Sequence, residues 1–421
     1  MPELILVGLN HRTAPVAIRE RAHVGSGELE EAISSLRALP GVEGASLLST
    51  CNRVEAVVSA SGEEVTGTIV DWLCQRAGVT RSELENHLYV LRQDAAVEHL
   101  FRVASGLDSM IIGEPQIGGQ VRCAFHAARN QASFDPLLRQ VFEQTLRVAK
   151  KVRTQTGIGL HAVSIPYAAV ELAKKIFGDL TGLRVLLLGA GSMGELTAEH
   201  LHKQQVKQVF VANRSYEHAV VLAQRFGGAA VQFDSLDQHL AECDIVIAST
   251  AAPHFVITED QVKRALHQRR MRSLFLIDLS VPRNIDPAVA AIDRAYLYNV
   301  DDLRSVDDAN TQARQDEASN AEEIIAAEVG AFRKRLMAQD AVPTILDLQK
   351  RVEEIRAAEL EKYLRKMGPI PVAQREAIEM LTLQMTNKIL HYPILHLREA
   401  SDEPQERESV RRTIRKVFGL R

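Results

Sequence analysis

Residues 183–201, LRVLLLGAGSMGELTAEHL, decide how the middle of the chain folds. The apolar run from Val185 to Leu188 is typical of a buried strand, and a glycine turn and a helical pattern follow it. Further strand-like runs, QVFVANRS, CDIVIAST and SLFLIDLSVPR, recur downstream with helical spacing between them. Strands that alternate with helices in this way predict a parallel, doubly wound sheet.

The glycine turn has the spacing of a dinucleotide-binding fingerprint. Its first glycine permits the tight turn, its second lets the backbone approach a pyrophosphate, and its third lets the helix pack on the strand. The helix N-terminus then offers free N–H groups and a positive dipole end to the phosphates. We therefore expect a dinucleotide site formed by Gly189, Ala190, Gly191, Ser192, Met193 and Gly194.

The end of the next strand indicates which dinucleotide is bound. NAD sites usually carry an acidic residue there for the ribose 2′-hydroxyl, whereas this chain has Asn213, Arg214 and Ser215. Arg214 can pair with a 2′-phosphate, and its two neighbours can hydrogen-bond it. The pattern favours NADPH, and the alternative is that Arg214 is a solvated turn residue.

A cysteine in the stretch STCNRVE, residues 49–55, is the candidate nucleophile. Cys51 lies between a strand-like run and polar neighbours, and Arg53 could lower its pKa, because nearby positive charge favours the thiolate. A thiolate so placed can form a covalent intermediate; the alternative is a structural cysteine at a strand end. The remaining cysteines lie among apolar residues and are expected to be structural: Cys74, Cys123 and Cys243.

Length and composition bound the class of protein. A chain of 421 residues is too long to fold around a single hydrophobic core. Its 46% hydrophobic and 25% charged residues are ordinary for a globular protein. A net charge of -4 argues against a generally basic DNA-binding protein but allows a local basic face, such as Arg147 to Arg153. No apolar run reaches the ~18 residues of a membrane span, and we expect the cytoplasm.

The chain divides into three predicted parts. Residues 1–158 read as a mixed α/β domain, with strands over 4–10, 45–50 and 54–60, helices over 28–39 and 136–153, and a loop at IIGEPQIGG. Residues 159–305 hold the dinucleotide-binding domain. Residues 306–421 begin with a long helix that ends near Asp340 and continue as helices broken at Gly368-Pro369 and Pro393. Their apolar stripes predict an oligomer.

His99 is a candidate for a role in catalysis, and the alternative is that it is an ordinary surface or partly buried histidine. It lies on the predicted helix AAVEHLFRVA, which leads into the loop near residue 109, so it could face the same pocket as Cys51. No HExxH or similar spacing indicates a metal site, and we expect none.

Several segments resemble the signature blocks of the glutamyl-tRNA reductase family. They are GLNHRTAPV, LSTCNRVE, VASGLDSMIIGEPQIGGQV, GAGSMG, ANRS, SVPRNIDP and YLYNVDDL. The blocks are long and rare, and together they cover nearly the whole chain, with the C-terminal helices the least distinctive part.

This resemblance implies a fold and a reaction. The fold would be a multidomain α/β protein: an N-terminal α/β catalytic domain, a central Rossmann-like NADP-binding domain, a long spinal helix and an all-helical dimerisation domain that makes a homodimer. The Cys51 thiol would attack glutamyl-tRNA(Glu), release the tRNA and form a thioester. NADPH would reduce the thioester to glutamate-1-semialdehyde, the first step of five-carbon tetrapyrrole synthesis. Handover of that aldehyde to its aminomutase is a further expectation.

The resemblance also implies the site residues. Cys51 would be the nucleophile, and His99 matches a position important for activity, with general acid–base work, orientation and activation of Cys51 all open as its role. Arg53 would hold the glutamate carboxylate with a bidentate fork. The family's substrate contacts fall here on Thr50, Asn52, Arg53, Ser109, Glu114, Pro115, Gln116 and Gln120.

Three alternatives compete with this reading. A shikimate-dehydrogenase-like enzyme would share the NADP domain but would need no thiol. An aspartate-semialdehyde-dehydrogenase-like enzyme usually opens with its dinucleotide fold, whereas here that fold starts near residue 160. A tRNA- or enzyme-binding module that lost its chemistry is disfavoured, because Cys51, the glycine fingerprint and Arg214 are all present.

Overall fold

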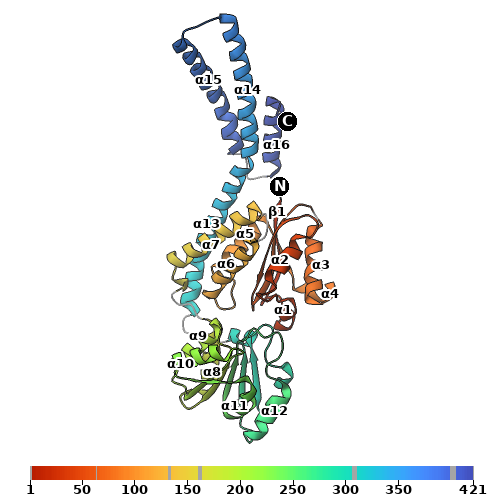
Figure 1. Cartoon of the computed structure of the whole chain (residues 1–421), viewed down its shortest axis with the longest axis vertical. Coiled ribbons are helices and arrows are strands. Elements are labelled where there is room, and N and C mark those ends of the chain that lie inside the picture. Colours follow the sequence, from red (N-terminus) through yellow and green to blue (C-terminus); the bar gives the residue numbers. More distant parts are fainter. Residues whose placement is uncertain are drawn as a thin grey trace. The chain divides into compact units, whose positions relative to one another are not determined.

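The computed structural model describes residues 2–62, 64–130, 134–159, 164–305, 311–398 and 404–420. The chain forms two compact units, Met1–Ala326 and Ala327–Arg421. The first unit contains two separate sheets, and the second unit is helical (Figure 1).

The N-terminal part of the first unit is built on an antiparallel sheet. Its strands in the described residues have the order β2-β3-β1-β4. Their bounds are β1 Glu3–Asn10, β2 Val42–Ser49, β3 Arg53–Ala60 and β4 Tyr89–Arg92. The two inner strands, β1 and β3, are buried along almost their whole length. Burial on both faces explains why these strands read as near-continuous apolar runs.

Helices surround this sheet and position its loops. Their bounds are α1 Val16–Ala22, α2 Leu29–Arg37, α3 Val65–Ala77, α4 Arg81–Leu84, α5 Gln93–Ala104, α6 Gln116–Arg129 and α7 Pro136–Gln155, with short 3-10 turns η1 Glu85–His87 and η2 Gly157–Gly159. Helix α7 starts where Asp135 accepts a bond from the N–H of Leu138, 2.8 Å away, and Pro136 fits the first helical position. Helices α5, α6 and α7 lie together beside the sheet (Figure 1).

The second part of the unit is a parallel sheet. Its strands are β5 Arg184–Leu188, β6 Gln208–Ala212, β7 Ala229–Val231, β8 Ile245–Ala248, β9 Leu274–Asp278 and β10 Ala295–Asn299. They lie in the order β10-β9-β8-β5-β6-β7, so the strand order reverses at β5. In such sheets a ligand binds beyond the carboxyl ends of the strands, at the point of reversal.

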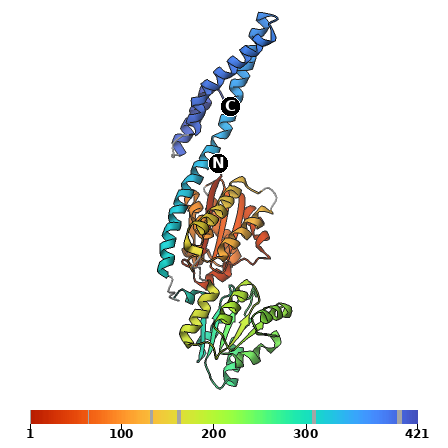
Figure 2. The ribbon, with the colours of Figure 1, turned by 90° about the vertical axis from the view of Figure 1, so that its left-hand side faces the viewer.

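Helices cover both faces of the parallel sheet (Figure 2). Alternate residues of β5 enter two different cores: Val185 and Leu187 enter one, and Leu186 and Leu188 enter the other. The covering elements are α8 Ile165–Phe177, α9 Ser192–Lys203, α10 Tyr216–Arg225, α11 Leu236–Glu242 and α12 Glu259–Gln268, with 3-10 turns η3 Phe233–Ser235, η4 Pro287–Ala291 and η5 Val300–Ser305.

Helix α13, Thr311–Asp340, begins in the first unit and ends in the second. The second unit continues with α14 Val342–Met367, α15 Val372–Arg398 and α16 Pro404–Phe418. A small core that includes Ile345, Leu348, Leu390 and Leu397 joins these helices. None of the helices described combines the length and apolar character needed to cross a membrane.

The predicted architecture is confirmed, with three local corrections. The segment IIGEPQIGG is not a loop throughout, because α6 begins within it at Gln116. Pro393 does not break α15; it lies inside the helix, between the buried anchors Leu390 and Leu397. Cys74 and Cys243 are buried as expected, but Cys123 is exposed on α6.

Candidate active site

Cys51 lies at the tip of the hairpin that joins β2 to β3. The backbone N–H of Thr50 donates to the carbonyl oxygen of Arg53 over 2.9 Å. The Thr50 hydroxyl oxygen accepts from the N–H groups of Asn52 and Arg53, each 3.1 Å away. These bonds fix the backbone around the cysteine. We refer to Thr50–Arg53 as the thiol loop.

The Cys51 thiol is half-buried against the apolar cluster that contains Ile111. Burial raises the pKa of Cys51 to about 12, the Glu114 carboxylate acts in the same direction, and Arg19 and Arg53 oppose them. Arg53 therefore acts to lower the pKa of Cys51, as expected from the sequence, but burial outweighs it and keeps that pKa far above neutral pH. At neutral pH the thiol is protonated, and it must lose its proton when it attacks.

The guanidinium of Arg53 is buried among acidic partners. Its Nη1 lies 2.7 Å from Oε1 of Glu55 and 3.0 Å from Oδ2 of Asp108, and its Nη2 donates to the Asp108 carbonyl. Burial acts to lower the pKa of Arg53, but Glu55, Tyr89 and Asp108 outweigh it and raise the pKa. A substrate carboxylate at Arg53 would have to share these partners, and that contact stays a prediction.

Glu55 connects Arg53 to His99, and the sequence-based site did not include it. Its Oε1 lies 2.8 Å from Nε2 of His99 and accepts from the Tyr89 hydroxyl at 2.5 Å. Burial alone would raise the pKa of Glu55, but the charges of Arg53 and His99 hold it well below its usual range. Within the described part of the chain, the bonding of His99 thus runs to Glu55 rather than to Cys51. The sequence did carry a signal for Glu55. It lies two residues after Arg53 on β3, and residues two apart on a strand point to the same face.

The segment between α5 and α6 supplies the second wall of the site. Asp108, Ser109 and Glu114 are all buried there. Burial raises the pKa of Glu114 to about 7, with Arg53 opposing. The bonds from Arg53 to Asp108 hold this segment against the thiol loop, and the Glu114 carboxylate is near enough to raise the pKa of Cys51. A carboxyl group of this kind titrates within the physiological range.

Two buried amide atoms of the site have no hydrogen-bond partner among the described residues. They are Oδ1 of Asn52, an acceptor, and Nε2 of Gln116, a donor. Buried polar groups are nearly always hydrogen-bonded, so each such exception calls for an explanation. One acceptor and one donor match the polar groups of a bound amino-acid moiety.

The predicted substrate residues therefore fall on two neighbouring segments. The thiol loop carries Thr50, Asn52 and Arg53, and the second segment carries Ser109, Glu114, Pro115, Gln116 and Gln120. Of the second group, Pro115 is exposed and Gln120 is half-buried at the start of α6. His99 joins the set through Glu55.

The glycine turn after β5 has the geometry of a phosphate cradle. Gly189 has φ +106°, and a Cβ there would lie 2.5 Å from the carbonyl oxygen of Ser249. A Cβ on Gly194 would lie 2.1 Å from the Gly189 carbonyl oxygen, so the helix packs tightly on the turn. A Cβ on Gly191 would meet nothing within 4 Å, which leaves open space where a pyrophosphate would approach. The residues present fit a dinucleotide.

The end of β6 supports the turn and presents Arg214. The Asn213 amide accepts from the Ala190 N–H at 3.2 Å and donates to the Ser215 carbonyl at 3.0 Å. The Ser215 hydroxyl donates to Glu217 at 2.7 Å. Arg214 is exposed beside them. Asn213 thus orders the glycine turn, and Arg214 is left accessible to a ligand.

No group of three or more His, Cys, Asp or Glu residues able to hold a metal ion occurs in the residues that the structure describes.

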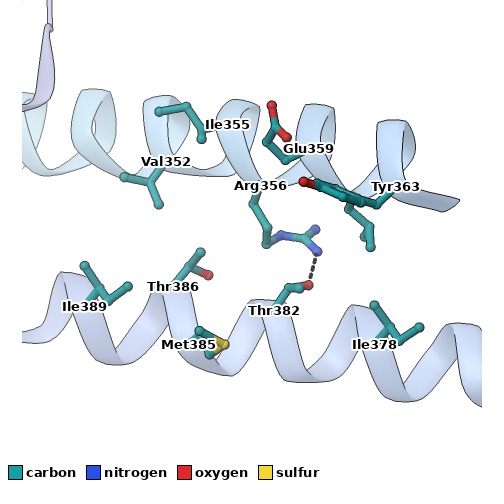
Figure 3. A pocket seen from close by; sticks show the side chains of 11 residues that line it. Val352, Ile355, Arg356, Glu359, Tyr363, Ile378, Thr382, Met385, Thr386 and Ile389 are labelled. Carbon is teal, nitrogen blue, oxygen red and sulfur yellow. Dashed lines mark hydrogen bonds between the residues drawn. The ribbon is translucent and has the colours of Figure 1, made fainter. Parts of the chain in front are cut away.

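The second unit carries an apolar groove between α14 and α15 (Figure 3). Its volume is about 500 Å³, and Arg356 crosses it to donate to the Thr382 hydroxyl at 3.2 Å. The groove is lined by Val352, Ile355, Arg356, Glu359, Leu360, Tyr363, Ile378, Thr382, Met385, Thr386 and Ile389. Several of these apolar side chains are about half exposed, among them Ile355, Met385 and Ile389. Such a surface is typical of an interface.

Three family models match the chain in succession. Residues 7–156 match the N-terminal domain of glutamyl-tRNAGlu reductase, and residues 320–420 match its dimerisation domain. Residues 171–306 match shikimate/quinate 5-dehydrogenase.

Whole-chain relatives agree with these models. Glutamyl-tRNA reductase of Desulfatibacillum aliphaticivorans is 44% identical over 419 residues, covering 99% of this chain and 96% of the relative. The enzyme of Solibacter usitatus is 42% identical and covers 99% of both chains. The solved structure of glutamyl-tRNA reductase from Methanopyrus kandleri is 34% identical, covers 100% of both chains and superposes with a TM-score of 0.51.

Proposed function

The chain belongs to the glutamyl-tRNA reductase family, and from that premise we propose how its residues reduce glutamyl-tRNA. Enzymes of this family are oxidoreductases that use a nicotinamide cofactor and catalyse the first committed step of five-carbon tetrapyrrole synthesis. The alternative of a shikimate-type enzyme is not retained, because that model matches only the middle of the chain.

The proposed chemistry has two halves that meet at Cys51. The thiol loses its proton as its sulfur attacks the ester carbonyl, a C–S bond forms, the C–O bond to the tRNA ribose breaks, and the ribose oxygen takes up a proton. The resulting thioester is more reactive toward hydride than an ester. A bound reduced nicotinamide cofactor supplies that hydride when present; the C–S bond then breaks, and the aldehyde and the Cys51 thiolate are released.

The observation that carries this proposal is the pair of unsatisfied buried amide atoms beside the thiol. Asn52 directly follows Cys51, and Gln116 lies two residues from Glu114, whose carboxylate influences the thiol. An amino-acyl group bound at Cys51 would offer an amino donor and carboxylate or carbonyl acceptors to them. Ser109 and Arg53 would complete the recognition of the glutamyl group, and His99 would hold the network through Glu55.

We propose NADPH as the cofactor. Arg214 is exposed beside the glycine turn, where its guanidinium can pair with a 2′-phosphate. Arg214→Asp should weaken NADPH much more than NADH, on the order of tenfold or more, because a charge-assisted pair becomes a repulsion. Affinities of both cofactors measured by fluorescence titration test this. If the affinities for NADPH and NADH fell equally, Arg214 would not be the residue that binds the 2′-phosphate.

The role of the Cys51 thiol is tested with radiolabelled glutamyl-tRNA, by following both the formation of the thioester and its reduction to the aldehyde. We expect Cys51→Ser to form no thiol-linked glutamyl adduct and to lose nearly all aldehyde production. Cys123→Ser is the matched control, because Cys123 is the exposed cysteine on α6 and should leave both readouts unchanged. Aldehyde formation by Cys51→Ser at the parental rate would refute the thioester mechanism.

The assembly proposed for the enzyme follows from the same match. We assign catalysis to residues 1–158, NADPH binding to 159–305 and dimerisation to 306–421. The partners are glutamyl-tRNA(Glu) and a second copy of the chain, held through the apolar groove of α14 and α15. We also propose the cytoplasm as location and delivery of the aldehyde to its aminomutase.

A further inference from the structure

Helix α1 carries an arginine to which the proposed reaction gives no role beyond the effect of its charge on the pKa of Cys51. The side chain of Arg19 is fully buried, with 0% exposure. A buried guanidinium is tolerated only where its N–H groups and its charge are satisfied. The partners of Arg19 therefore indicate what it holds in place.

Those partners come from two distant parts of the chain. Nε of Arg19 donates to the backbone carbonyl of Cys51 at 3.2 Å, and Nη1 donates to the carbonyl of Ala14 at 2.9 Å. The two terminal nitrogens also form a fork on Asp301, with Nη2 2.9 Å from Oδ1 and Nη1 3.2 Å from Oδ2. The N–H of Val16 donates to the same carboxylate at 3.1 Å. One side chain thus joins the thiol loop to the segment that follows β10.

The next residue of α1 makes a second connection to the parallel-sheet domain. The carboxylate of Glu20 accepts from Arg283 at Nη2 (2.5 Å), Nε (2.9 Å) and the backbone N–H (3.2 Å). Arg283 lies in the loop after β9, at the carboxyl edge of the sheet, where a dinucleotide binds. Consecutive residues of opposite charge on α1 therefore bond to complementary residues at that edge.

We propose that Arg19 is a positioning residue for the hydride-transfer half of the reaction, holding the Cys51 loop at a fixed place relative to the dinucleotide site through Asp301. This inference rests on the proposed thioester function. Attack on the ester needs only the thiol loop and the substrate residues, all in the N-terminal domain. Hydride transfer needs a group from each domain within ~3.5 Å, and a misplacement of about 1 Å can lower such a rate about a hundredfold.

The two halves are separated in single-turnover experiments. The glutamyl adduct on the full-length protein is formed without cofactor and its rate measured, and NADPH is then added and decay of the adduct to aldehyde followed. Asp301→Asn removes the charge of the fork with little change in shape. We expect its rate of adduct formation to stay within ~2-fold of the parent, its rate of reduction to fall at least ~10-fold, and its affinity for NADPH to be unchanged.

The second connection supplies a control for charge. Glu20→Arg and Arg283→Glu should each slow reduction by several fold, and the double variant, which restores an ion pair of opposite polarity, should recover most of the loss. A purely structural weakening would not be repaired by the exchange. Arg19→Lys keeps the charge and loses the fork, so it should resemble Asp301→Asn if it folds.

The outcomes separate this inference from the function on which it depends. If the parent forms no adduct, the thioester function fails and this inference with it. If the parent forms and reduces the adduct but Asp301→Asn slows both halves equally, slows neither, or loses NADPH affinity in proportion, Arg19 does not position the thiol loop for hydride transfer.

Discussion

The Glu114 carboxylate influences the ionisation of Cys51, which leads to a prediction at the scale of single residues. The pKa of Glu114 is raised to about 7, so its carboxylate is mostly charged above that pH and mostly neutral below it. When charged, it disfavours the Cys51 thiolate and helps to raise the thiol pKa. Glu114→Gln should therefore speed alkylation of Cys51 by iodoacetamide above pH 7, by roughly three- to fourfold for each unit that the thiol pKa falls, because the gain in thiolate is partly offset by its weaker nucleophilicity.

The size of this effect depends on pH, because only the charged form of Glu114 disfavours the thiolate. Below about pH 6, where Glu114 is already neutral, Glu114→Gln should leave the alkylation rate nearly unchanged. Labelling of each cysteine is measured by peptide mass spectrometry, with the exposed Cys123 as an internal standard in the same sample. Equal acceleration at pH 6 and pH 8, or parallel acceleration at Cys123, would contradict the electrostatic cause.

Residues of the site differ in how well the sequence predicts them. Cys51 was a candidate from its place between an apolar strand and polar neighbours, and the role of Arg53 in binding the substrate came from the resemblance to the family. Asp108 was not identifiable, because its bond to Arg53 joins positions 55 residues apart. The tie between Arg19 and Asp301 spans 282 residues. Bonds between residues so far apart in the sequence depend on how distant segments pack together. The local sequence pattern carries no information about that packing.

Among the elements, the long apolar strands and the glycine turn were predicted, whereas the strands β4, β7 and β10 were not, and helix boundaries were predicted less well than the long strands. The apolar run of β5 and its glycines carry strong local signals. Pro393 was expected to end a helix, yet α15 continues through it, since losing one backbone bond is tolerated when buried residues on either side hold the helix. The start of α6 at Gln116 was not predicted, because the two glycines that follow it are typical of a loop.

Helices α6 and α7 each present a basic face, and we expect these faces to contact tRNA phosphates. Arg122 and Arg129 are exposed on α6, which contains no acidic residue, and Arg147 and Lys150 are exposed on α7. Nη2 of Arg153 would lie 3.8 Å from a Cβ on Gly118, so the basic end of α7 lies beside the start of α6 and its predicted substrate residues.

Neutralising part of this surface should weaken tRNA binding without altering the chemistry. For the double variant Arg147→Ala, Lys150→Ala we expect a higher KM, a kcat within about 2-fold of the parent, and a salt dependence of binding reduced by roughly 0.7–0.9 per lost phosphate contact. The control is Lys174→Ala, Lys175→Ala, which removes two exposed lysines from α8. Binding of tRNA is measured at several salt concentrations, and equal effects of the two double variants would argue against this surface.

At the scale of the whole molecule, the proposed chemistry and the proposed association fall in different units. The thiol loop, its acidic network and the glycine turn all lie within Met1–Ala326, and the apolar groove lies within Ala327–Arg421. The proposed site of one chain is thus assembled from that chain's own residues. A change confined to the groove should therefore separate association from the first half of the reaction.

Ile389 provides that change. It is 59% exposed, lines the groove, and continues the helical spacing of Ile378, Thr382 and Met385 (Figure 3). A carboxylate placed there would be desolvated in an interface, so Ile389→Glu should shift the protein from dimer to monomer in sedimentation velocity. Lys388→Glu, the adjacent exposed position outside the groove, adds the same side chain and should leave the dimer intact. The monomer should still form the Cys51 adduct. An Ile389→Glu protein that remains dimeric would show that the groove is not the interface, and a monomer unable to form the adduct would show that the site depends on the second copy.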